Sequence, residues 1–201
     1  TGVANLVGGI NDVGDTIVEG NGNLMWGTGK HNVSTDSFGN IGIGNNNIFD
    51  GAVGAGGFGQ LHKVTASYCY AFGAGNLCNA QYGFAGGYGN DIHAGTAVAI
   101  GRNNYVGSSG IYGGTVGYTN RVNAQQTYTF GRFVNESRTK MVTIGNGENA
   151  NSLNRDISIG YGNITISKNV TYTPSLNTGS NAGTDLCLDA NNQLCACGTC
   201  A

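Results

Sequence analysis

Short apolar pairs recur along this chain, each in a fixed relation to a glycine. In the stretch 95–106, GTAVAIGRNNYV, Val98 and Ile100 alternate with alanines, and Gly101 follows directly. Alternation with a period of two puts Val98 and Ile100 on one face of an extended strand and the alanines on the other. We assign the larger pair to the core. A polar, Asn-rich turn then leads to another apolar residue, Val106.

The same phrase returns along most of the chain. Its glycine can be placed at Gly9, Gly27, Gly44, Gly59, Gly73, Gly87, Gly101, Gly117, Gly131, Gly145 and Gly160, at intervals of 14 to 18 residues. Five residues after the glycine a second apolar or small residue recurs, at Val64, Cys78, Ile92, Val106, Val122 and Ala150. Each repeat therefore predicts two short strands with inward side chains, joined by tight turns. Because one repeat buries almost nothing alone, about eleven of them must stack as a β-solenoid.

Repeat spacing also suggests the domain organisation. Residues 1–36 hold two loosely spaced repeats, which we interpret as an atypical N-terminal cap. Residues 37–163 form the regular β-roll. Residues 164–201 begin with a partly alternating strand, Ile164–Thr173, and continue through a polar linker, Ser175–Gly183. They end in a cysteine-rich hairpin, Asp185–Cys197, predicted to turn at Asn191-Asn192.

Composition narrows the class of protein. Of 201 residues 37 are glycine and only 10% are charged, a composition often found in disordered chains. The near-regular period, the presence of a single proline and the aromatic content (7 Phe, 10 Tyr, 1 Trp) favour a folded all-β chain instead. A net charge of −2 without a Lys/Arg cluster argues against a nucleic-acid partner. No apolar run is long enough to predict a membrane-spanning helix.

The six cysteines fall into two groups. If the residues three and one before each repeat glycine point inward, Cys69 points outward and Cys78 points inward. A disulfide between them is therefore not expected, and Cys78 is predicted to be a buried free thiol. The other four are Cys187, Cys195, Cys197 and Cys200. Their spacing matches no familiar zinc site, and disulfides within a small hairpin in an oxidising compartment are favoured over zinc. Bridges between chains are a further alternative.

Catalysis finds little support in the residues. The carboxylates are scattered, and the closest pair of interest, Asp12 and Asp15, falls in a terminal repeat where a solvated turn is expected. The glycine runs lack the Gly-Lys-Ser/Thr of a phosphate loop, and no nucleophile elbow is present. Ice binding would need one constant short residue at the predicted outward positions, which vary: Ala97, Ala99, Thr127, Thr129 and Ser158. We predict no enzyme, no cofactor and no metal site.

The repeats resemble a known family. The phrases Ala97-Val98-Ala99-Ile100-Gly101, Val142-Thr143-Ile144-Gly145 and Ile157-Ser158-Ile159-Gly160 are similar to the head repeat of trimeric autotransporter adhesins of the YadA type, a repeat also found on bacteriophage tail fibres. The likeness covers about residues 37–163. It implies a left-handed parallel β-roll, three chains side by side, and the Val and Ile of the phrase in the core. Because no adhesin-like neck, coiled-coil stalk or membrane anchor follows, a phage fibre or another self-assembling extracellular fibre is favoured.

These observations predict a non-enzymatic fibre or adhesin head, homotrimeric, at a cell or virion surface. It would bind a glycan or protein receptor through irregular inserts such as the 16-residue interval after Gly101. Tyr105, Tyr112 and Tyr118 are the candidate contact residues, since exposed tyrosines suit adaptable contacts. The alternatives are a self-assembling extracellular filament and a carbohydrate-active enzyme, which would need a carboxylate-lined groove.

Overall fold

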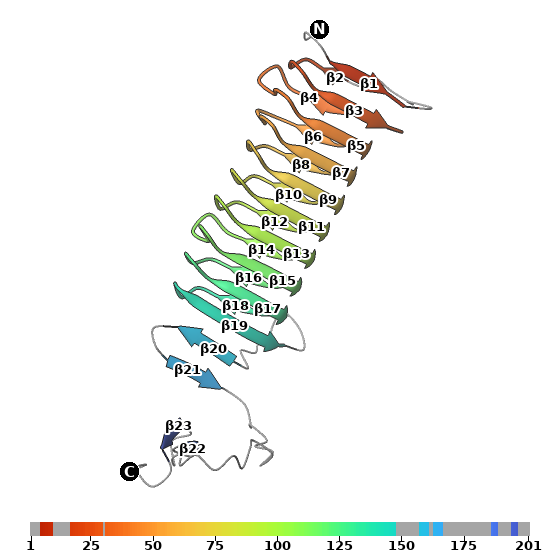
Figure 1. Ribbon diagram of the computed structural model, residues 1–201. Coiled ribbons are helices and arrows are strands. Elements are labelled where there is room, and N and C mark those ends of the chain that lie inside the picture. The colour runs from red at the N-terminus through yellow and green to blue at the C-terminus, as the bar shows by residue number, and fades with distance from the viewer. Residues whose placement is uncertain are drawn as a thin grey trace, which may run out of the picture. The chain divides into compact units, whose positions relative to one another are not determined.

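A computed structural model describes residues 5–9, 17–29, 31–147, 157–160, 163–166, 186–188 and 194–196. All regular structure in these ranges is β-strand. Contacts divide the chain into two units, residues 1–169 and 170–201. The first is a stack of parallel coils (Figure 1), which confirms the predicted β-solenoid.

Two parallel sheets form the solenoid. Sheet A holds β1 (Leu6–Gly8), β3 (Leu24–Gly27), β5 (Ile41–Asn45), β7 (Gly56–Gln60), β9 (Tyr70–Ala74), β11 (Phe84–Tyr88), β13 (Val98–Arg102), β15 (Gly114–Tyr118), β17 (Tyr128–Arg132) and β19 (Met141–Asn146). Sheet B holds β2 (Ile17–Val18), β4 (Asn32–Val33), β6 (Ile48–Phe49), β8 (Lys63–Val64), β10 (Leu77–Cys78), β12 (Asp91–Ile92), β14 (Tyr105–Val106), β16 (Arg121–Val122) and β18 (Asn135–Glu136). In Figure 1 the odd-numbered strands from β1 to β19 lie on one side of the stack and the even-numbered strands from β2 to β18 on the other.

The parallel stack ends at β19. The strand that carries the last predicted repeat glycine, β20 (Ile157–Gly160), pairs with β19 in the antiparallel sense and continues into β21 (Asn163–Ile166). The prediction of one more parallel repeat at Gly160 was therefore wrong.

The side chains of sheet A that were predicted to point into the core point outward, and those predicted to point outward are buried. Ala99 is 0% exposed, whereas Ile100 is 41% exposed. The same holds along the sheet: Ala97, Thr127, Thr129 and Ser158, all predicted outward, are buried. The core between the sheets is filled mostly by small side chains from sheet A and by Val or Ile side chains from sheet B, such as Ala85 and Ile92, with Met25 and Phe49 in the N-terminal coils. This narrow space leaves no room for a second column of branched residues, so the larger Val and Ile face outward.

The second predicted column is correct. Val64, Cys78, Ile92, Val106 and Val122, five residues after each glycine, are all 0% exposed on the inner face of sheet B. Ala150 lies outside the described residues. In the next coil the same position is Glu136, whose buried carboxylate accepts hydrogen bonds from the Arg138 guanidinium and the Thr143 hydroxyl, both at 2.8 Å. The apolar column of sheet B therefore ends at an ion pair between the buried Glu136 and Arg138.

A column of buried amides connects the coils. We call it the asparagine ladder: Asn47, His62, Asn76, Asn90, Asn104 and Asn120, each three residues after its repeat glycine. The Oδ1 of Asn90 accepts from the backbone N–H of Asn104 at 3.1 Å, and its Nδ2 donates to the carbonyls of Gly86 and Gly101 at 2.9 and 3.0 Å. Every donor and acceptor of the amide is used, which is the condition for burying one at low cost.

The repeat glycines stack without room for a side chain. A Cβ added to Gly87 would lie 2.0 Å from the carbonyl oxygen of Gly101, and the φ of Gly87 is 111°. The same approach recurs at each coil from Gly27 to Gly131. Close backbone contact, together with a φ that other residues avoid, explains why the phrase requires glycine at this point.

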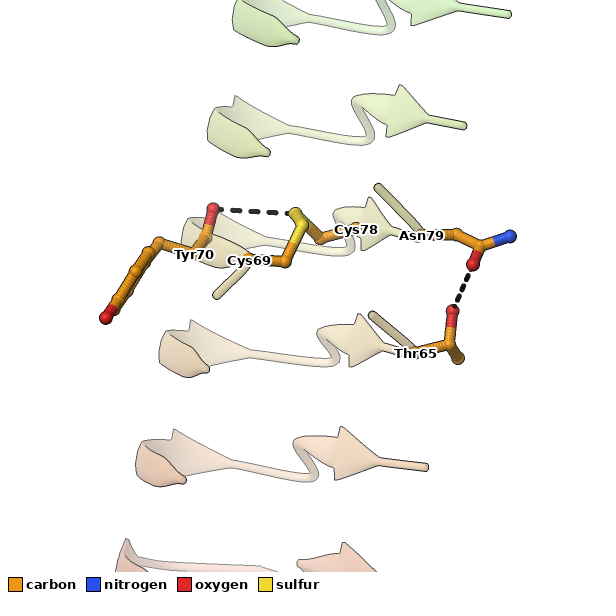
Figure 2. Close-up of a disulfide and its surroundings, with 5 residues drawn as sticks. All are labelled: Thr65, Cys69, Tyr70, Cys78 and Asn79. Atoms are coloured by element: carbon orange, nitrogen blue, oxygen red, sulfur yellow. Dashed lines mark hydrogen bonds between the residues drawn. A yellow bond between two sulfur atoms is a disulfide. The ribbon is translucent and has the colours of Figure 1, made fainter. Parts of the chain in front are cut away.

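One coil carries a disulfide. Cys69, just before β9, is bonded to Cys78 in β10, with the two Cα atoms 6.0 Å apart (Figure 2). Both side chains are 0% exposed. The predicted outward position of Cys69 and the predicted free thiol of Cys78 were therefore both wrong. Their cause is again the inverted facing, because Cys69 belongs to the inward column of sheet A.

The second unit contains one described hairpin. Strands β22 (Leu186–Leu188) and β23 (Leu194–Ala196) are antiparallel, with Cys187 opposite Cys195. The pairing confirms the predicted C-terminal hairpin. The turn at Asn191-Asn192, the residues Cys197 and Cys200, and the side chains of all four cysteines lie outside the described part, so the choice between disulfides and zinc stays a prediction.

Candidate interaction surface

The outward side chains of sheet A form two apolar columns along the solenoid, which we call the sheet A outer face. One column lies three residues before each glycine: Leu24, Ile41, Gly56, Tyr70, Phe84, Val98, Gly114, Tyr128 and Val142. The other lies one residue before it: Trp26, Ile43, Phe58, Phe72, Gly86, Ile100, Val116, Phe130 and Ile144. None of these positions carries a charge. Eleven of the side chains are between 36% and 55% exposed.

Neighbouring coils bring these side chains into contact. The rings of Phe58 and Phe72 stack at 4.7 Å between centroids, and those of Phe72 and Phe84 lie 5.5 Å apart. The hairpin beyond β19 extends the columns, since Ile157 lies opposite Ile144 and Ile159 opposite Val142. A continuous apolar surface of this length is unusual on a protein that stays monomeric and typical of an interface.

The outer face of sheet B differs in chemistry. Its outward positions include Lys63, Asp91 and Arg121, and Oδ1 of Asp91 lies 2.7 Å from Nε2 of His93. A solvated face carries such residues. The two outer faces of one solenoid are therefore distinguished by charge, because the two apolar columns on sheet A contain no charged residue.

The predicted contact tyrosines lie at three separate places. Tyr105 is on the outer face of sheet B, with the Arg121 guanidinium 4.4 Å from its ring centroid. Tyr112 is 56% exposed on the turn before β15, with a φ of 57°. Tyr118 ends β15, where its ring faces Arg102 at 5.8 Å and meets the Phe133 ring edge-on at 5.3 Å. The structure thus gives two of the three tyrosines an arginine partner.

A row of aromatic and arginine side chains borders the glycine column, and the sequence interpretation missed it. One residue after each glycine stand Tyr88, Arg102, Tyr118 and Arg132, aligned on adjacent strands β11, β13, β15 and β17. We call these four residues, together with Phe133, the Tyr–Arg ladder. The sequence does contain this signal, because tyrosine and arginine alternate one residue after the repeat glycine. The alternation is visible only when the repeats are aligned on their glycines.

The glycine column itself forms a shallow depression at the N-terminal coils. It is lined by Trp26 and Ile43 on one side, Thr28, Asn45 and Gln60 on the other, and glycines at its floor. Because the glycines lack side chains, the floor exposes backbone. The lining contains no carboxylate, which the predicted alternative of a carbohydrate-active enzyme would require.

The described residues contain no group of three His, Cys, Asp or Glu side chains placed to hold a metal ion. Asp12 and Asp15 lie outside the described ranges. The buried Glu136 has its bonds filled by Arg138 and Thr143, and the hydrogen bond to Glu136 raises the pKa of Arg138 above its ordinary value. The described residues include no helix that is long and apolar enough to cross a membrane.

Comparisons with protein families, with curated proteins and with solved structures find no match to this chain.

Proposed function

We propose that this protein is a non-enzymatic fibre head in which three copies pack their sheet A outer faces against one another. The observation that carries the proposal is the uncharged apolar surface that runs over every coil from Leu24 to Ile144. Its occupant is a second and third copy of the same chain, because the pattern repeats at the spacing of the coils themselves. Two parallel copies would then present matching columns along their whole length.

Burial of these eleven partly exposed apolar side chains would favour association, because removing apolar surface from water contributes about 25 cal/mol per Å².

The proposed place of action is the exterior of a cell or a virion. The disulfide between Cys69 and Cys78 supports this, because such bonds persist in oxidising compartments. The proposed role is binding to a surface receptor, a glycan or a protein, through side chains that differ from coil to coil. The resemblance to adhesin and tail-fibre heads favours this role over a purely structural one.

The second candidate is a self-assembling filament. It is favoured by β1, a strand at the edge of sheet A whose Leu6 and Val7 are 60% and 48% exposed. An unpaired edge of this kind can accept another chain. End-to-end growth would need a free parallel edge at the opposite end as well, and there β20 already pairs with β19 in the antiparallel sense. The trimeric head is therefore the stronger candidate.

The test is the molar mass of the native protein by light scattering after size exclusion, with and without reductant. A trimer has three times the 20.6 kDa chain mass. Ile100→Glu together with Phe130→Glu places two charges on the sheet A outer face and should give monomers. Leu77→Glu, on the outer face of sheet B, is the matched control and should leave the trimer intact.

Two results would contradict the proposal. A wild-type monomer at every concentration would mean that the sheet A outer face is not an interface between copies. A mass that grows without limit as the concentration rises would favour the filament instead.

A further inference from the structure

The Tyr–Arg ladder has the geometry of a binding surface. The Arg102 guanidinium lies between two rings, 5.5 Å from the centroid of Tyr88 and 5.8 Å from that of Tyr118. Two coils further, the Arg132 guanidinium lies 6.0 Å from the Phe133 centroid. These distances are within the range of cation–π attraction, which restricts each arginine to the surface of its neighbours.

The arginines of the ladder have no acidic partner in the described part of the chain. The contacts between basic and acidic side chains found there join His93 to Asp91 and Arg138 to Glu136. The N–H donors of a guanidinium lie in its plane. Contact with the face of an aromatic ring therefore leaves these donors without an acceptor. Arg102 and Arg132 are both exposed, and their donors are therefore open to a ligand from solvent.

The ladder has a fixed period. Arg102 pairs with Tyr118, and Tyr118 pairs with Arg132, so the two arginines stand two strands apart. Two strand spacings are roughly 9.5 Å. Exposed aromatic rings lie between and beside the charges, with Tyr88 56% and Tyr118 37% exposed. The complementary ligand is an extended polymer that alternates an anionic group with an uncharged, flat unit.

We propose that the Tyr–Arg ladder binds an acidic glycan, whose carboxylate or sulfate groups pair with Arg102 and Arg132 while its sugar rings lie on the tyrosines. A planar guanidinium pairs with such oxyanions through two parallel hydrogen bonds. The inference rests on the proposed receptor-binding role and specifies its ligand class. Nucleic acid is the weaker choice, because two arginines on a chain of net charge −2 do not match its dense phosphates.

The test measures the affinity of the full chain for heparin and hyaluronate, with dextran as the uncharged reference. Arg102→Gln and Arg132→Gln should each weaken binding to an acidic glycan by about tenfold. Arg121→Gln is the matched control, since it removes the same charge from an arginine that also lies over a tyrosine, but on sheet B. Its affinity should stay within about twofold of wild type.

Three outcomes would overturn the inference: equal weakening by Arg121→Gln and Arg102→Gln, equal binding of dextran, or tighter binding of duplex DNA than of either acidic glycan. The molar mass of each sample separates this result from the proposed assembly. A trimer that binds no acidic glycan contradicts only the ladder inference. A monomer that binds it contradicts only the trimer, because the ladder lies within one chain.

Discussion

The backbone N–H of Asn76 donates a hydrogen bond to Nδ1 of His62 at 3.3 Å, in the place where the other coils use an asparagine Oδ1. On the other side of the ring, Nε2 lies 3.2 Å from the carbonyl of Phe58, to which it donates. His62 therefore continues the asparagine ladder only as the neutral imidazole with its proton on Nε2. A second proton on Nδ1 would face the N–H of Asn76 and break the ladder.

This relationship predicts a loss of stability in acid. Burial lowers the pKa of His62 below its ordinary value of 6.5, against the opposing effect of the Phe58 and Gly73 carbonyls. Between the folded pKa and 6.5 the unfolded chain binds the proton and the folded chain does not, so the free energy of unfolding falls as the pH falls through this interval. Thermal melting from about pH 8 to about pH 5 should show the decrease.

The matched variant for this effect is His62→Asn, which restores the residue of the neighbouring coils. It should melt at or above the wild-type temperature at low pH and lose the part of the pH dependence that His62 causes. Identical pH profiles for the two proteins would contradict the assignment to His62.

Removal of one asparagine from the ladder should be costly. In Asn104→Ala, the buried backbone N–H of Asn120 and the partly buried carbonyls of Ile100 and Gly117 lose their bonds to the Asn104 side chain. We expect the free energy of unfolding to fall by about 2–3 kcal/mol. Urea denaturation followed by circular dichroism measures it.

The control is Asn79→Ala, at an exposed asparagine that accepts a hydrogen bond from the Thr65 hydroxyl at the surface (Figure 2). Its effect should stay below about 0.5 kcal/mol. Equal costs at Asn79 and Asn104 would mean that the ladder adds nothing beyond ordinary surface contacts.

A side chain in the glycine column should not be tolerated. Gly87→Ala adds a Cβ on the backbone of the next coil and forces a strained φ, for a combined cost of about 2–6 kcal/mol. Gly75→Ala separates the two causes, because Gly75 also has a positive φ but has open space around its Cβ position. Gly75→Ala should cost only about 1–2 kcal/mol. The prediction fails if the two variants unfold at the same urea concentration.

The disulfide should stabilise the fold in a redox-dependent way. Its loop of 9 residues predicts a gain of about 2–3 kcal/mol from restriction of the unfolded chain. Replacing both Cys69 and Cys78 by alanine should lower the free energy of unfolding by this amount. Reductant should destabilise the wild type in the same way and leave the double variant unchanged. A double variant that still loses stability in reductant would assign the effect to other cysteines.

The sequence predicted the fold well because the solenoid is specified by local repetition. The glycine of each repeat and the inward residue five positions later identify the strand–turn–strand unit. Which face of sheet A points into the core was not predictable in this way. Alternation shows that Val98 and Ile100 share a face, but the size rule that puts larger side chains in the core fails where the core is as narrow as it is here.

The site was harder to predict for a related reason. The Tyr–Arg ladder is made by residues one coil apart, Tyr88, Arg102, Tyr118 and Arg132, whose proximity follows from the register between strands rather than from sequence distance. The disulfide depended on the same unknown facing. Tyr105 and Tyr118 were chosen from the sequence as exposed aromatics, and the arginines that lie against them could be found only from the paired strands.

Contact between glycine backbones has a consequence for how such a protein changes in evolution. Gly73, Gly87 and Gly101 stand 14 residues apart and in exact pairing from strand to strand. Duplication of one whole repeat would insert a coil whose strands and glycine pair with the adjacent coils in the same register. A shorter insertion would break this register unless it forms a loop outside the sheets. The two additional residues between Gly101 and Gly117 are accommodated in this second way, in the turn before β15. A whole coil could therefore be added or removed without a change in the cross-section of the solenoid.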